Sequence, residues 1–118
     1  PVYDASSKLV GWMERRIDAT PKYMYSKGLK KSQLLFGEHK VKSTQTVCIT
    51  EGALDTMWLS QNGYVSLALL GASFSREQQA RLTALKPEEI ILCLDSDDVQ
   101  EIRKQSLLNE VIENRAFW

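Results

Sequence analysis

The chain has 118 residues, of which 43% are hydrophobic, and it carries 15 basic and 15 acidic side chains. This size and composition are ordinary for one globular domain, or for a small domain with an appendage. It contains no apolar run long enough for a membrane span and no charged-then-apolar leader, so we expect a cytoplasmic protein with no membrane partner. Because the sequence opens on Pro1 within a predicted strand, we expect it to be part of a longer protein.

The neutral total hides an uneven distribution of charge. Residues 14–42 contain eight Lys or Arg against three acids, a balance of +5, whereas the chain from Val47 onward contains six against eleven, a balance of −5. A basic arm beside an acidic pocket is suited to holding a polyanion together with metal ions. The two cysteines, Cys48 and Cys93, lack the short paired spacing of a zinc or redox motif and are predicted to be core residues.

The first part of the chain predicts a small antiparallel hairpin. Val2–Tyr3 and residues 9–17 are predicted strands, and the turn-rich residues 4–8 join them. Arg15 and Arg16 follow each other on the second strand, so alternation directs them to opposite faces.

Residues 18–37 are polar and lack a helical stripe, which predicts an extended, loop-like connection. Aromatic and basic side chains alternate in it, a combination that holds single-stranded nucleic acid by stacking and phosphate contacts. These residues are Lys22, Tyr23, Tyr25, Lys27, Lys30 and Lys31. A solvated loop whose tyrosines pack on a sheet explains the composition equally well. The apolar residues 34–36 are predicted to anchor the loop to the core, and His39 is predicted to lie at the surface without a role.

From Val47 the pattern becomes strand, helix, strand, helix, strand, helix. The predicted strands are apolar runs that begin at Val47, Tyr64 and Ile90. The first helix follows Glu51 and stops at Asn62-Gly63, and its apolar face is predicted to comprise Leu54, Met57, Trp58 and Gln61. A capping box, Ser75 with Gln78, predicts a helix over residues 76–85, and a third helix is predicted over residues 99–114.

Carboxylates follow two of the predicted strands, Glu51 after the first and Asp95 and Asp97 after the third. Crossovers between parallel strands are right-handed almost without exception, so the loops that carry these acids share one edge of the sheet. Clustered carboxylates repel one another unless a proton or cation intervenes, and their oxygens suit magnesium, which is commonly shared with substrate phosphates. An acid after a strand can also be merely solvated or favour the start of the next helix, and for Asp55 this structural reading stands beside a supporting role at the metal.

The order Glu51-Gly52-x-x-Asp55, then Leu70-Gly71-Ala72-Ser73, then Asp95-Ser96-Asp97 resembles the Toprim domain. This domain is shared by DnaG-type primases, topoisomerases of types IA and II, OLD-family nucleases and RecR-type proteins. Upstream motifs resemble the segment that precedes Toprim in DnaG-type primases, bacterial or phage. These motifs are Pro1 to Asp4, Val10-Gly11-Trp12, Arg15, Pro21-Lys22-Tyr23, and Lys31 followed by Leu35-Phe36-Gly37.

The resemblance implies a role for each matching residue. Glu51 is expected to act as a general acid or base or as a ligand, and Asp95 and Asp97 to hold Mg²⁺, with Mn²⁺ as an alternative. Arg15, Lys22 and Lys31 are expected to bind nucleic acid or nucleotide. Gly52, Asp55 and Gly71 are expected to support the site, and the small residues Gly71, Ala72 and Ser73 would let the backbone approach a ligand closely.

The predicted fold is an α/β Toprim-like parallel sheet flanked by helices, preceded by the small antiparallel hairpin and basic loop. Residues 1–42 would end a basic subdomain, and residues 43–118 would form most of a Toprim domain. The family usually places a glycine after the Asp-x-Asp pair, where this chain reads Asp98-Val99-Gln100, so the local turn is expected to differ. A further acidic motif downstream and a zinc module upstream are also expected outside this sequence.

The function implied is synthesis of RNA primers on single-stranded DNA from ribonucleoside triphosphates, a nucleotidyl transfer. A replicative helicase is the expected partner, through regions outside this chain. Two alternatives remain open. One is another Toprim enzyme, a nuclease or topoisomerase, and the other is a non-catalytic Toprim module that binds nucleic acid.

Overall fold

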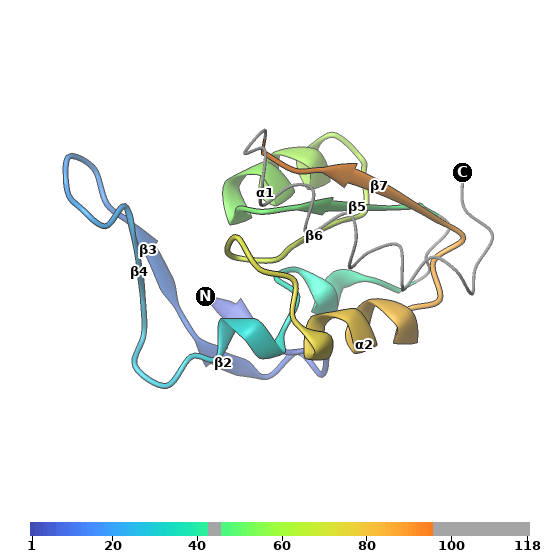
Figure 1. The fold of residues 1–118 in the computed structure, drawn as a ribbon, viewed down its shortest axis with the longest axis horizontal. Helices are drawn as coiled ribbons and strands as arrows, with labels where there is room; N and C mark the ends of the chain where they lie inside the picture. Colours follow the sequence, from blue (N-terminus) through green and yellow to red (C-terminus); the bar gives the residue numbers. More distant parts are fainter. Residues whose placement is uncertain (43–45, 96–118) are drawn as a thin grey trace.

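A computed structural model describes residues 1–42 and 46–95 of the chain. Its central sheet has three parallel strands in the order β6-β5-β7, with β5 at Thr46–Thr50, β6 at Ser66–Ala68 and β7 at Glu89–Cys93. Helix α1 (Ala53–Gln61) connects β5 to β6, and α2 (Arg76–Ala84) connects β6 to β7 (Figure 1). The predicted strand and helix alternation is therefore confirmed as far as β7. The helix predicted over residues 99–114 lies outside the described residues.

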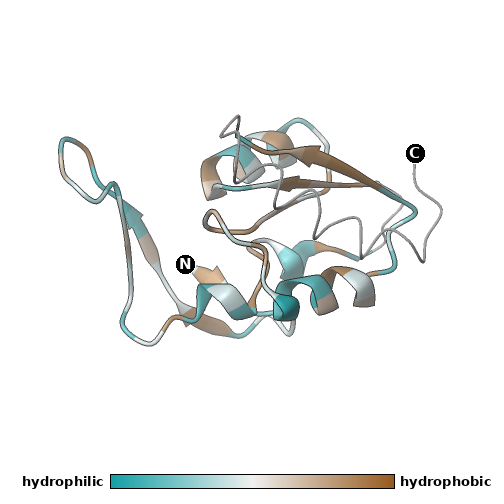
Figure 2. Ribbon diagram, in the orientation of Figure 1, coloured by the Kyte–Doolittle hydropathy of each residue, from teal (hydrophilic) through white to brown (hydrophobic). Residues whose placement is uncertain are grey.

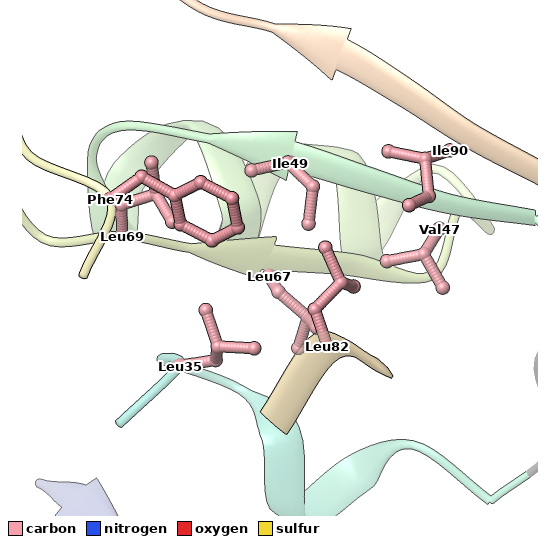
Figure 3. Close-up of a cluster of buried hydrophobic side chains, with 8 residues drawn as sticks. All are labelled: Leu35, Val47, Ile49, Leu67, Leu69, Phe74, Leu82 and Ile90. Carbon is pink, nitrogen blue, oxygen red and sulfur yellow. The ribbon is translucent and has the colours of Figure 1, made fainter. Parts of the chain in front are cut away.

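The main core lies between the sheet and α2. Side chains alternate along a strand, so Val47 and Ile49 of β5 point to the same face, where Leu82 of α2 packs against them. Figure 3 shows Leu82 and Leu35 directed at this face of the sheet. Burial of such residues is the main favourable term in folding, and Figure 2 shows β5 and β7 coloured as hydrophobic along most of their length.

Cys48 and Cys93 project from β5 and β7 as free thiols. Cys48 is buried, as predicted, whereas Cys93 is half-buried. Ile91 lies two residues before Cys93 in β7, so both side chains point to the same face of the sheet. The Ile91 side chain is 42% exposed. Among the described residues, the face of the sheet opposite α2 is therefore incompletely covered over β7.

The predicted apolar face of α1 is wrong. Leu54, Met57 and Trp58 are 48%, 42% and 63% exposed, and the helix instead buries Ala53 and Thr56 against the sheet. Two small residues allow close contact between helix and sheet. The hydroxyl of Thr56 is satisfied by two other buried hydroxyls, so its burial carries no unpaired polar group.

The segment before the sheet forms two antiparallel pairs rather than one. β1 (Val2–Tyr3) pairs with β2 (Leu9–Gly11), which confirms the first hairpin, and β3 (Met13–Arg15) pairs with β4 (Tyr23–Tyr25). The predicted single strand over residues 9–17 divides at Trp12. Its backbone N–H donates to Ser26 Oγ at 2.9 Å and its carbonyl accepts from Ser26 N at 2.8 Å. The predicted loop over residues 18–37 thus contains β4 as well as a 3₁₀ turn, η1, at Lys31–Gln33.

Residues 34–36 anchor this arm to the sheet, as predicted. Leu34 and Leu35 are buried, and Phe36 exchanges two backbone hydrogen bonds with Ala68 of β6, at 2.9 and 3.1 Å. A second 3₁₀ turn, η2, follows at Glu38–Lys40. His39, predicted to lie at the surface, is half-buried, with its ring centroid 4.8 Å from that of Tyr3. No helix within residues 1–42 and 46–95 has the length and apolar character needed to cross a bilayer.

Candidate functional site

The carboxyl ends of the three parallel strands lie on the side of the molecule from which the β3–β4 hairpin projects (Figure 1). Glu51 directly follows β5, the central strand, and Asp95 lies two residues beyond the end of β7. Thr50 and Cys93 are partners in the parallel register. Glu51 is the first residue beyond this pair on one strand, and Asp95 is the second residue beyond it on the adjacent strand. Adjacent strands lie about 4.8 Å apart. The fold thus brings the starting points of these two acidic loops to one edge, with Glu51 half-buried and Asp95 exposed.

Gly71 approaches the same edge from the other neighbouring strand. Beyond the end of β6, Leu69 N donates to Thr50 O at 3.0 Å and Leu70 N donates to Glu51 O at 2.8 Å. The backbone that precedes Gly71 is therefore hydrogen-bonded to the turn that carries Glu51. A Cβ atom placed on Gly52 or Gly71 would meet no atom within 4 Å, so open space lies in front of both.

A series of hydrogen-bonded hydroxyl groups, buried between α1 and the sheet, fixes the Glu51 turn. Thr50 Oγ1 donates to Gly52 O at 3.0 Å and lies 2.8 Å from Thr56 Oγ1, which in turn lies 3.1 Å from Ser66 Oγ. These bonds join the end of β5, the first turns of α1 and the start of β6. They hold the backbone on each side of Glu51 in one conformation.

The remaining predicted acids have different placements. Asp55 is exposed in the first turn of α1, where a negative charge is favoured by the helix dipole. Asp97 lies outside the described residues. Within residues 1–42 and 46–95 no group of three His, Cys, Asp or Glu side chains is placed to hold a metal ion. The three-carboxylate site therefore remains a prediction, of which the structure describes two members.

Lys31 is joined to this edge through an aromatic ring. Its ammonium nitrogen lies 4.4 Å from the centroid of the Tyr25 ring, and the Tyr25 hydroxyl donates to Leu70 O at 3.5 Å. Burial, with the neighbouring Tyr23 as a smaller cause, raises the pKa of the Tyr25 phenol. The phenol is thus neutral at ordinary pH and keeps the proton that it donates.

Arg15 and Lys22 lie further out, on the projecting hairpin. Arg15 pairs with Tyr23 across the two strands, and its guanidinium carbon lies 6.0 Å from the Tyr23 ring centroid. Lys22 is exposed, and its carbonyl accepts from Arg16 N at 2.6 Å. Because side chains alternate along the strands, Arg15, Tyr23 and Tyr25 share one face of the hairpin.

Gln78 is a residue whose importance the sequence reveals only in part. The predicted capping box is confirmed, since Ser75 Oγ accepts from Gln78 N at 3.1 Å and Gln78 Oε1 accepts from Ser75 N at 2.9 Å. The side-chain amide also donates to three backbone carbonyls, those of Lys31, Leu34 and Leu69, at 3.3, 3.1 and 2.9 Å. Gln78 thereby ties the basic segment to the end of β6, a role that its capping position alone does not disclose.

A parallel sheet with helices between its strands, and acids at the carboxyl ends, is the α/β arrangement predicted from the sequence. Residues 45–101 match the family model of the Toprim domain. A DNA primase of Rickettsia felis is 34% identical over 107 residues, and one of Thermotoga maritima is 34% identical over 106. These alignments cover 83% and 82% of this chain but only 18% and 19% of the two primases. An uncharacterised protein of Mycoplasma pneumoniae is 27% identical over 98% of this chain and 57% of its own length.

Solved structures give the same result. The zinc-binding and RNA polymerase domains of the Aquifex aeolicus primase match all of this chain with a TM-score of 0.78 at 23% identity, over 32% of that structure. A DNA primase domain from Pseudomonas aeruginosa matches 97% of the chain with a TM-score of 0.75 at 26% identity, over 38% of that structure. Residues 45–101 thus match the Toprim domain, and the chain is similar to DnaG-type primases in sequence and in fold, which confirms the predicted resemblance and fold class.

Proposed function

We propose that this chain is part of the catalytic core of a primase, which joins ribonucleoside triphosphates into short RNA primers on single-stranded DNA. The observation that carries the proposal is the placement of Glu51 and Asp95 at the ends of adjacent parallel strands, on the side where the aromatic and basic hairpin projects. The primase relatives aligned with more than four-fifths of the chain support the same class of function.

The acids at this edge fit a magnesium ion by the chemistry of their donors. Mg²⁺ prefers oxygen ligands and is usually held by one or two carboxylates together with waters and substrate phosphates. Asp95 and Asp97 are two residues apart, so on extended backbone both would face the same way, and Glu51 would complete the set or exchange a proton. When bound, Mg²⁺ lowers the pKa of an attacking hydroxyl and stabilises charge on a transferring phosphoryl group.

The basic side chains have a complementary task. Lys31 lies beside the loop between β6 and α2, where it can pair with a phosphate that approaches the acidic edge. Arg15 and Lys22 extend the positive surface along the hairpin, toward the backbone of a template strand. Positioning and neutralisation of charge supply most of the rate in phosphoryl transfer.

The proposal includes a division of the chain and a set of partners. Residues 1–42 would end the basic subdomain and residues 43–118 would form most of the Toprim domain. A replicative helicase would bind the full-length protein through regions outside this chain.

Templated primer synthesis by the full-length protein tests the assignment of the acids. We expect Glu51→Gln and Asp95→Asn each to lower the rate by about 100-fold or more, because each removes a charge that holds the metal or moves a proton. Glu88→Gln is the matched control, since Glu88 is exposed at the opposite end of β7. Unchanged synthesis in both test variants would overturn the assignment.

The same assay separates the alternatives. Scission of DNA strands without addition of nucleotides would place the protein with the Toprim nucleases or topoisomerases. DNA binding without either reaction, and without uptake of Mg²⁺ or Mn²⁺ dependent on Glu51, Asp95 and Asp97, would indicate a binding module.

A further inference from the structure

Tyr25 connects three parts of the chain that are distant in sequence. It lies on β4 opposite Met13, its ring packs against the smaller core cluster around Leu34 and Leu70, and its hydroxyl donates to the Leu70 carbonyl. The Lys31 ammonium lies over the same ring at 4.4 Å. One side chain therefore contacts the hairpin, the basic segment and the loop that is hydrogen-bonded to the Glu51 turn.

The backbone of the Lys31 segment is held separately, by the start of α2. Gln78 Nε2 donates to the carbonyls of Lys31 and Leu34, and Ser75 Oγ donates to the Ser32 carbonyl. Arg81 Nε donates to Gln33 O at 2.6 Å. With the backbone fixed in this way, the freedom that remains to Lys31 lies in its long side chain.

A lysine side chain with an exposed ammonium group samples many rotamers, and binding a phosphate with it carries the entropic cost of selecting one. A cation over an aromatic face is attracted by the ring, so the population of rotamers narrows before the ligand arrives. The ring of Tyr25 is itself fixed by its packing and by its bond to Leu70 O. The Tyr25 ring can therefore hold the Lys31 ammonium at a defined position relative to the β6–α2 loop.

We propose that Tyr25 is a positioning residue that holds the Lys31 ammonium at the carboxyl edge of the sheet, ready to bind a phosphate oxyanion. This inference rests on the proposed function for the identity of the ligand. The phosphate would belong either to the backbone of single-stranded DNA or to an incoming ribonucleoside triphosphate. Tyr25 would not touch the reacting atoms and would act only through Lys31.

A double-mutant cycle in the full-length protein tests the coupling. The variants are Tyr25→Leu, which removes the ring, Lys31→Gln, which removes the charge, and the two combined, with Tyr25→Phe as the variant that keeps the ring. The affinity for labelled single-stranded DNA without nucleotide gives one readout, and the KM for ATP in primer synthesis gives the other. A response confined to one readout identifies which phosphate Lys31 binds.

We expect Tyr25→Leu to weaken the responding readout by about threefold to tenfold, Lys31→Gln by about tenfold, and the double variant by no more than Lys31→Gln alone. Tyr25→Phe, which keeps the ring but loses its bond to Leu70 O, should give a loss between those of the native protein and Tyr25→Leu. If Lys31 contacts DNA, Lys31→Gln should also reduce the slope of log affinity against log salt by about 0.7. Additive losses, or no response of either readout to Lys31→Gln, would overturn the positioning role.

Two further outcomes are distinguishable. Coupled losses in DNA affinity, in a protein that makes no primers, would overturn the proposed function but not the positioning role. Primer synthesis by the native protein, together with additive losses in the variants, would overturn the positioning role but not the proposed function. If Tyr25→Leu does not fold, the ring-current shift of the Lys31 ε-methylene protons in the native protein decides the matter. An upfield shift that changes on addition of DNA or ATP supports the proposal, and random-coil shifts in both states overturn it.

Discussion

The hydroxyl group of Thr56, in α1, lies 2.8 Å from the hydroxyl group of Thr50, the last residue of β5. Both side chains are buried, and Ser66 of β6 extends the contact at 3.1 Å. Glu51 follows Thr50 directly, so the position of this candidate catalytic carboxylate depends on a polar network within the layer between helix and sheet. Such a network is stabilising only when every member is satisfied.

Thr56→Val should therefore destabilise the protein although it keeps the shape of the side chain. It removes two hydrogen bonds and leaves the Ser66 hydroxyl without this partner, which costs about 1–3 kcal/mol in the free energy of unfolding. Ser60→Ala, on an exposed position of the same helix, should stay within about 0.5 kcal/mol. Urea unfolding curves of the two variants make the comparison, and equal stability would contradict the importance of the network.

Gln78→Leu should be more damaging than a surface change two residues away in the same helix. The leucine cannot donate to the buried carbonyls of Leu34 and Leu69, and buried carbonyls that lose a donor cost free energy, whereas the Lys31 carbonyl still accepts from Leu34 N at 3.5 Å. We expect a loss of about 2–4 kcal/mol in the free energy of unfolding. Arg76→Ala, exposed at the start of α2, serves as the control and should change stability by less than about 0.5 kcal/mol. A Gln78→Leu variant as stable as this control would show that the amide is dispensable.

Arg15→Gln and Lys22→Gln should weaken binding of single-stranded DNA and reduce its dependence on salt. Each phosphate contact that is lost should lower the slope of log affinity against log salt by about 0.7. Lys40→Gln is a matched control, because Lys40 is exposed in η2, outside the hairpin. Fluorescence anisotropy at several salt concentrations measures the slopes. If the hairpin variants match the control, the nucleic acid does not lie along the hairpin.

The two cysteines should react with iodoacetamide at different rates. Burial raises the pKa of the Cys48 thiol above its ordinary value of 9.0, with the neighbouring Cys93 as a smaller cause, so less of the reactive thiolate is present at neutral pH. Cys93 is only half-buried and should be alkylated first.

The same shift affects stability. The folded chain keeps the Cys48 proton to a higher pH than the unfolded chain, so stability should fall as the pH rises above 9.0. Cys48→Ala should flatten that decline.

Peptide mapping after timed alkylation tests the order in which the two cysteines react. Faster labelling of Cys48 than of Cys93 would contradict the burial of Cys48.

The sequence was informative where local pattern and tertiary structure agree. β5 and β7 are apolar runs, and the Ser75 and Gln78 capping box marks the start of α2 to the residue. The shared edge of the acidic loops follows from the parallel direction of β5 and β7, which the alternation of strands and helices predicts. These features depend on periodicity, turn chemistry and chirality, all of which a sequence displays.

The features that the sequence concealed depend on contacts between distant segments. The apolar pattern of α1 indicated Trp58 as a core residue, but the sheet accepts Ala53 and Thr56 because the hydroxyl partners of Thr56 come from β5 and β6. β4 is only three residues long and gives no periodic signal, and its pairing with β3 defines it. The reach of the Gln78 amide to Lys31 spans 47 positions.

The central claim is that Glu51 and the Asp95 and Asp97 pair form one binding site for a divalent ion at the carboxyl edge of the sheet. Isothermal titration calorimetry of Mg²⁺ and Mn²⁺ into the full-length protein tests it most directly. Glu51→Gln, Asp95→Asn and Asp97→Asn should each abolish or greatly weaken the same binding event, while Glu88→Gln at the opposite edge leaves it intact. Binding that is unchanged in all three variants, or that is absent from the native protein, would contradict the claim.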